Sequence, residues 1–152
     1  MSYLRIWIHI VFSTKNREPY LITEVRAKVL RHITENCKEK GIYLQAIDGY
    51  LEHIHCLISL DGEQSISKVV QLIKGESSNW ANKNQIASGK FAWQDDYFAV
   101  SISESHYEKV ADYIKNQEQH HSIKSFSDEI NEFMNKLWMG KEAGISFPLS
   151  VR

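Results

Sequence analysis

The sequence has few of the residues that interrupt or cross-link a chain. Its 152 residues include two prolines, two cysteines and seven glycines. With 43% hydrophobic and 24% charged residues, this composition excludes a collagen-like or disordered chain. Cys37 and Cys56 form no CxxC pair and cannot build a disulfide framework, which favours a reducing compartment. We therefore expect one globular, cytoplasmic domain over residues 1–152.

Long hydrophobic runs are also lacking. No apolar run approaches the roughly 20 residues that a membrane-spanning helix needs. The beginning of the sequence, MSYLRIWIHIVFSTKNR, lacks the basic start, long apolar stretch and small-residue cleavage site of a signal peptide. The sequence therefore predicts a soluble, intracellular protein with no membrane association.

An excess of one charge is missing as well. The 18 Lys and Arg residues oppose 19 Asp and Glu residues, a formal net charge of −1, so nothing global indicates a nucleic-acid binder. The charge is nevertheless uneven. Residues 1–45 hold eight basic and four acidic residues, a net charge of +4, and the remaining 107 residues carry −5. Any contact with a nucleic-acid backbone is therefore expected mainly in the N-terminal third.

Hydrophobic periodicity predicts the order of the elements. Strand composition covers 4–13, 42–47, 51–60 and 91–102, the last with a break at Gln94–Asp96. Helical spacing covers 22–40, 65–82, about 105–120 and about 127–138, and Ser105 with Glu108 forms a capping-box pattern at the third helix. This order predicts an α+β, ferredoxin-like βαββαβ antiparallel sheet with helices on one face plus C-terminal helices. Because that fold has many functions, the function must be argued from a site.

A His-x-His pair and a Tyr-x-x-x-Gln pair are the candidate site. Side chains alternate along a strand, so His53 and His55 point the same way and can hold a divalent metal. Tyr113 and Gln117 share one helix face, so Gln117 could complete a metal triad beside Tyr113. His9 would neighbour this site if its strand face agrees. Each pair has a plainer interpretation: hydrogen-bonded surface histidines, and a core tyrosine with a solvated glutamine.

Four segments together make one pattern over residues 4–121: HIVFSTKNR (9–17), LEHIHCLISL (51–60), WQDDYFAVSISES (93–105) and YIKNQEQHH (113–121). Their order and spacing resemble the single-tyrosine HUH transposases of small insertion sequences, which are TnpA-like, and the related REP-associated tyrosine transposases. The resemblance implies a homodimer that recognises hairpins at element ends in single-stranded DNA.

The resemblance also implies a role for each site residue. His53, His55 and Gln117 would hold Mg²⁺ or Mn²⁺. Tyr113 would attack the scissile phosphodiester, leaving a 5′-phosphotyrosine and a free 3′-OH. Thr14, Lys15 and Arg17 match the family's Thr-Lys-x-Arg pattern and would contact the DNA backbone or hairpin.

Several alternatives stay open. The basic residues of the first helix, from Arg26 to Lys40, could extend the DNA-binding surface. Trp93, Tyr97 and Phe98 could stack on bases, although core packing is the commoner role for such aromatics. A domesticated or inactive relative would bind hairpin nucleic acid without transposing. An unrelated ferredoxin-like protein would bind a small ligand or a metal.

Overall fold

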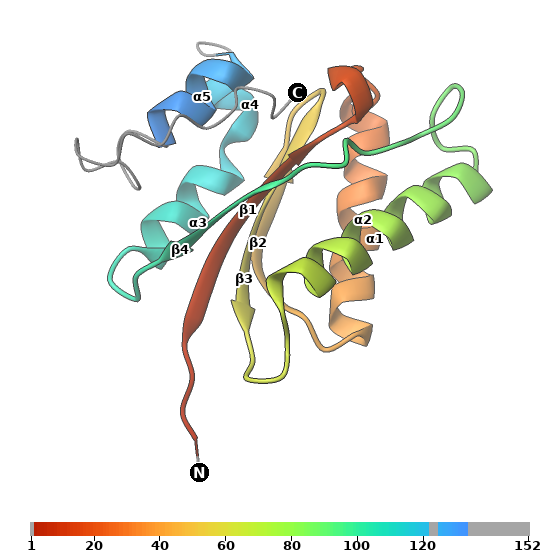
Figure 1. Cartoon of the computed structure of the whole chain (residues 1–152). Coiled ribbons are helices and arrows are strands. Elements are labelled where there is room, and N and C mark those ends of the chain that lie inside the picture. The colour runs from red at the N-terminus through yellow and green to blue at the C-terminus, as the bar shows by residue number, and fades with distance from the viewer. Residues whose placement is uncertain (1, 122–124, 134–152) are drawn as a thin grey trace.

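The molecule is built on a four-stranded antiparallel sheet (Figure 1). The computed structural model describes residues 2–121 and 125–133. The strands lie in the order β2-β3-β1-β4, and their bounds are Ile6–Ser13 (β1), Tyr43–Gly49 (β2), His53–Leu60 (β3) and Phe98–Ile102 (β4). This order is that of a ferredoxin-like sheet and confirms the predicted fold class.

Helices cover both faces of this sheet (Figure 1). The two long helices, α1 (Thr23–Glu39) and α2 (Ile66–Lys83), pack on one face. The C-terminal helices α3 (Tyr107–Lys115), α4 (Gln117–His121) and α5 (Phe126–Phe133) lie on the other. A short 3-10 turn, η1 (Lys15–Arg17), follows β1. No helix among the described residues is long and apolar enough to cross a membrane.

The two central strands separate two kinds of interior. β1 pairs with β3 so that Val11 lies opposite His55 and Ser13 opposite His53. Alternate side chains face α1 and α2, and all of these are apolar: Ile8, Ile10, Phe12, Ile54, Cys56 and Ile58. The intervening positions face the C-terminal helices, and they mix apolar with polar side chains: Trp7, His9, Val11, Ser13, His53, His55 and Leu57.

A tight hairpin connects β2 to β3 next to the first histidine. The backbone N–H of Tyr50 donates to the carbonyl of His53 at 3.0 Å. A Cβ at Gly49 would lie only 2.4 Å from that same carbonyl oxygen, so a larger residue would displace the start of β3. Gly49 therefore fixes the place at which His53 enters the sheet.

One predicted strand needs correction, and one predicted helix is described only in part. The strand predicted over 91–102 is regular only in β4, and Trp93 makes a single bridge to Thr14. The ammonium of Lys74 donates to the carbonyls of Gln94 and Asp95, which holds the predicted break. The last helix ends at Phe133 among the described residues, and the rest of the predicted segment, to residue 138, lies outside them.

The third predicted helix differs at both its start and its middle. It begins at Tyr107, with His106 as N-cap and no side-chain cap bond, so the predicted capping box does not form. The Ser105 hydroxyl instead contacts Nδ1 of His106 at 3.0 Å. A break at Asn116 (φ −115°, ψ 32°) divides the predicted helix into α3 and α4.

Candidate functional site

The His-x-His pair lies at the centre of the polar interior. Strand alternation directs both rings toward the C-terminal helices, and His53 and His55 are both 0% exposed. Their ring centroids are 5.1 Å apart. The surface-histidine interpretation is therefore wrong.

His55 is held from the neighbouring strand. Nε2 of His9 lies 2.8 Å from Nδ1 of His55, so the expectation that His9 neighbours the site is confirmed. Nε2 of His55 donates to a carboxylate oxygen of Glu129 at 2.6 Å, which makes Nδ1 of His55 the acceptor from His9. Burial lowers the pKa of His55 to about 4, so the ring is neutral at physiological pH. A neutral imidazole is the form that binds metals.

His53 has oxygen atoms near both ring nitrogens. Nδ1 lies 2.7 Å from the Glu52 carboxylate, and Nε2 lies 3.3 Å from Oε1 of Gln117 and 3.4 Å from Oε1 of Glu129. Burial lowers the pKa of His53, but the Glu129 and Glu52 carboxylates outweigh it and raise the pKa above its ordinary value. The two carboxylates therefore favour the protonated form of His53 against the effect of burial.

Tyr113 and Gln117 reach the histidines from either side of the break at Asn116. Gln117, the first residue of α4, is 0% exposed, and its backbone N–H is bonded to the carboxyl of Asp48 on β2. Tyr113, on α3, is half-buried, with its ring centroid 6.2 Å from that of His55. The solvated-glutamine interpretation is therefore wrong. All four candidate site residues meet within one chain.

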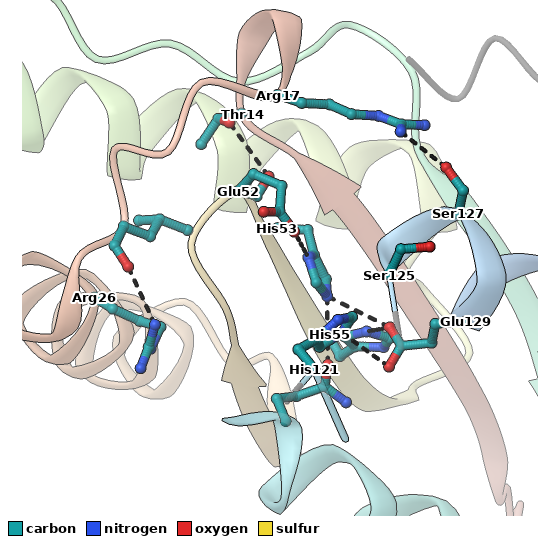
Figure 2. Close-up of polar contacts among 12 residues, drawn as sticks. Thr14, Arg17, Arg26, Glu52, His53, His55, His121, Ser125, Ser127 and Glu129 are labelled. Atoms are coloured by element: carbon teal, nitrogen blue, oxygen red, sulfur yellow. Dashed lines mark hydrogen bonds and ion pairs between the residues drawn. The ribbon is translucent and has the colours of Figure 1, made fainter. Parts of the chain in front are cut away.

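Glu129 is the residue that the sequence analysis missed. It reaches the cluster from α5, is 1% exposed, and its ion-pair partners among the described residues are all histidines (Figure 2). Nε2 of His121 lies 3.1 Å from Oε2 of Glu129, and the Tyr113 hydroxyl donates to that same oxygen, whereas His53 and His55 contact Oε1. A signal existed in the sequence: Glu129 is a carboxylate three residues after Phe126 and next to Ile130, both buried, so it lies within the apolar face of a helix.

Charge and burial explain the protonation states in the cluster. Burial raises the pKa of Glu129, but hydrogen bonds from His121, His53 and His55 hold it well below its usual range, so the carboxylate is ionised. Burial and the neighbouring Glu129 carboxylate together raise the pKa of Tyr113 well above its ordinary value. The phenol is therefore protonated and serves as a hydrogen-bond donor.

The donor set fits a divalent cation. His53, His55 and Glu129 each offer one ligand atom, and these atoms lie within 4.8 Å of one another. The Gln117 carboxamide oxygen lies beside them. Two imidazole nitrogens with carboxylate and amide oxygens are a mixed set that borderline and hard divalent metals accept.

The predicted DNA contacts lie beside this cluster. The Thr14 hydroxyl is buried and donates to the carbonyls of Glu18 and Glu52, so it holds the turn after β1 (Figure 2). Lys15 is exposed on that turn. Arg17 lines a cleft of about 280 Å³ and donates to the Ser127 hydroxyl at 3.0 Å. The other lining residues are Tyr50, Glu52, His121, Ser125, Phe126 and Ser127.

The predicted surface contribution of Arg26 is wrong, whereas core packing, the commoner role of such aromatics, is confirmed for Trp93 and Phe98. The Arg26 side chain, labelled in Figure 2, is 7% exposed. It binds inward, to the carbonyl of Leu21 and the carboxylate of Glu118. Trp93 and Phe98 are core residues at 7% and 3% exposure, whereas Tyr97 is 37% exposed. Lys28, Arg31, Lys38 and Lys40 remain exposed along α1.

Comparison with known proteins identifies the family. Residues 2–117 match the family described as transposase, IS200 like. The transposase for insertion sequence element IS200 of Salmonella typhimurium is 28% identical over 115 residues, covering 72% of this chain and 74% of that protein. The ISDra2 transposase TnpA of Deinococcus radiodurans is 22% identical over 114 residues, 72% of this chain and 81% of its own.

Solved structures share the fold. A REP-associated tyrosine transposase, solved bound to a REP hairpin, has a TM-score of 0.57 at 22% identity, covering 98% of this chain and 94% of its own. A crystal structure of a protein assigned as a transposase from Deinococcus radiodurans has a TM-score of 0.60 at 22% identity, covering 77% of this chain and 95% of its own. On the family match over most of its length, the chain belongs to the IS200-like transposase family.

Proposed function

We propose that this transposase cuts and rejoins single-stranded DNA through a covalent bond to Tyr113, with a divalent metal held by His53, His55 and Gln117. The observation that carries the proposal is the meeting of the Tyr113 hydroxyl with the buried His pair in one polar cluster. A tyrosine placed beside metal-ligand side chains is the arrangement that phosphoryl transfer to a phenol requires.

The chemistry follows from the groups present. The Tyr113 oxygen forms a bond to phosphorus as the bond to the 3′ oxygen breaks, which leaves a 5′-phosphotyrosine and a free 3′-OH. The phenol loses a proton and the 3′ oxygen gains one. Mg²⁺ or Mn²⁺, when bound, would withdraw charge from the phosphate and stabilise the anionic transition state. One phosphoester replaces another, so rejoining needs no ATP.

The DNA substrate is proposed to be a hairpin with a single-stranded flank. The REP hairpin bound by the structural neighbour supports this proposal. Lys15 and Arg17 lie on the turn beside the site, where they can bind the phosphates that lead to Tyr113. The exposed lysines and arginine of α1 can extend this contact. The buried Thr14 would hold the turn rather than touch DNA.

A covalent-adduct assay tests the function. The protein is incubated with Mn²⁺ or Mg²⁺ and a library of labelled hairpins with randomised loops and flanks, and labelled adducts are resolved on a denaturing gel. We expect an adduct that Tyr113→Phe abolishes and that Tyr107→Phe, on the same helix, retains. Hairpin binding without an adduct would indicate a relative that does not cut. The absence of both hairpin binding and an adduct would contradict the proposal.

The same assay tests whether one chain is sufficient. Family members are expected to be homodimers, but here Tyr113 lies beside the histidines of its own chain. A mixture of Tyr113→Phe and His53→Ala chains should therefore give no adduct, because no chain keeps both groups. Recovery of the adduct in the mixture would place the tyrosine in a partner's site.

A further inference from the structure

Glu129 joins the two halves of the proposed site with one side chain. One carboxylate oxygen lies 2.6 Å from Nε2 of His55 and 3.4 Å from Nε2 of His53. The other accepts the hydrogen bond from the Tyr113 hydroxyl. These are the imidazole nitrogens proposed to bind the metal and the oxygen proposed to attack phosphorus.

We propose that Glu129 is an additional ligand of the cation and, through its second oxygen, a positioning residue for Tyr113. This inference rests on the proposed function, since it requires both a bound metal and a tyrosine nucleophile. It makes α5 part of the active centre.

Burial supports a functional role for the Glu129 carboxylate. A carboxylate at 1% exposure is costly unless it is paired, and a structural carboxylate is commonly paired with Lys or Arg. Among the described residues, the ion-pair partners of Glu129 are His53, His55 and His121. Two of these three are the proposed metal ligands. Together with a neutral amide, two neutral imidazoles would give a divalent cation no compensating charge, and Glu129 supplies one negative charge.

Neighbouring residues of α5 make their own contacts with the rest of the molecule. The ring of Phe126, three residues earlier, stacks on His53 at 4.1 Å between centroids. Arg17 holds the same turn of α5 through Ser127, and its guanidinium lies 5.2 Å from the centre of the Phe126 ring. Ile130, also on α5, packs in the hydrophobic core that the C-terminal helices share with the sheet. Glu129→Gln should therefore remove the charge while α5 stays docked.

Metal binding without DNA is the first test. Mn²⁺ is titrated calorimetrically into the full chain and into Glu129→Gln, Asp128→Asn and His55→Ala. Asp128→Asn is the matched control, because it removes the same charge from an exposed position on the same helix. We expect the Mn²⁺ dissociation constant to rise about tenfold or more in Glu129→Gln. It should be unchanged in Asp128→Asn, and binding should be lost in His55→Ala.

The rate of adduct formation at saturating Mn²⁺ tests the positioning role. With the metal site filled, the rate of adduct formation in Glu129→Gln should still be lower by about tenfold or more, because the Tyr113 oxygen is no longer held in position to attack phosphorus. Glu129→Asp, which keeps the charge at a shorter reach, should recover Mn²⁺ affinity better than it recovers the rate. Circular dichroism of each variant confirms that it is folded.

The outcomes separate this inference from the proposed function. Normal Mn²⁺ affinity in Glu129→Gln with loss in His55→Ala would overturn the ligand role of Glu129 and leave the proposed metal site standing. A faster adduct rate in Glu129→Gln would show that the carboxylate obstructs the substrate, and would overturn the positioning role. Normal Mn²⁺ affinity in His55→Ala would count against the proposed metal site itself.

Discussion

The two faces of one pair of strands contain equally buried but chemically opposite interiors. Ile54 and His55 are neighbours on β3, and each is 0% exposed. Ile54 packs among aliphatic and aromatic side chains beneath α1 and α2. His55 lies in a hydrogen-bonded cluster beneath the C-terminal helices, between His9 and Glu129.

The difference shows that burial alone does not reveal what a side chain contributes. Removing apolar surface from water stabilises the fold directly. Removing imidazole and carboxylate groups from water costs free energy, which their hydrogen bonds and ion pairs offset without large net gain. The α1 and α2 face is therefore explained by the stability that apolar burial provides, whereas the polar part of the other face is explained by its chemistry.

Mutation of the two neighbouring positions tests this contrast most strongly. Ile54→Ala should lower the free energy of unfolding by about 2–5 kcal/mol, because it leaves a cavity in a fully buried aliphatic cluster. Its folded fraction should bind Mn²⁺ with normal affinity. Urea denaturation gives the first quantity, and calorimetric titration at low temperature gives the second.

The matched variant on the other face is His55→Gln. It should lose Mn²⁺ affinity and lower the free energy of unfolding by less than Ile54→Ala does, since each hydrogen bond it loses contributes about 1 kcal/mol net. If His55→Gln were the more destabilising of the two, the polar face would be a main source of stability and the contrast would fail.

Acid should affect the polar face selectively. The pKa of His55 is lowered from 6.5 to about 4 in the folded chain. The unfolded chain therefore takes up a proton at this residue as pH falls below about 6.5, and the folded chain does not. Lowering the pH from 7 to 5 should reduce the free energy of unfolding by about 2 kcal/mol through His55. Urea denaturation in the presence of a chelator measures the change.

His55→Gln and Ile54→Ala are the controls for this pH effect. The first removes the titrating group, so its loss of stability between pH 7 and 5 should be smaller by about 2 kcal/mol. The second should keep the full pH dependence of the parent chain. His53 acts in the opposite direction, because its pKa is raised in the folded chain. Its contribution to the free energy of unfolding is present at low pH and is lost as pH rises. An equal pH response in both variants would exclude His55 as the cause.

The fold was predictable because its signals are local. Strand composition marked β1 and β3, and helical spacing marked α1 and α2, all within a few residues of their true ends. The short polar break before β4 was visible as well. The break at Asn116 was not, because tertiary bonds to Gln117 and Glu118 from distant residues hold it.

The site residues were predictable only where both members of a pair lie on the same predicted helix or strand. His53 with His55, and Tyr113 with Gln117, are two-residue patterns on single elements, and the family resemblance joined them. Glu129 is marked locally only as a carboxylate within the apolar face of a helix. Its meeting with His55 and His121 depends on the packing of α5 and of the end of α4, which no local pattern specifies. Arg26 looked like a surface cation because helical periodicity does not reveal a distant carboxylate partner such as Glu118.

The smallest expected effect concerns a buried residue that contacts a proposed ligand from the neighbouring strand. His9 is 0% exposed, and its Nε2 lies 2.8 Å from Nδ1 of His55. A metal bound at Nε2 of His55 would require the proton on Nδ1, where His9 can accept it and orient the ring. His9→Phe keeps an aromatic ring at this position and removes that bond, so Mn²⁺ affinity should fall about tenfold, as calorimetric titration would show.

Val11, the next position facing the same helices, provides the comparison for His9. Val11→Ala should lower the free energy of unfolding by about 2 kcal/mol or more without changing Mn²⁺ affinity, because Val11 belongs to the apolar part of this face. His9→Phe should show the reverse pattern, and His9→Gln, whose amide can still accept from Nδ1 of His55, should recover part of the affinity. An unchanged affinity in His9→Phe would mean that His9 fills space and that the polar interior ends at His55.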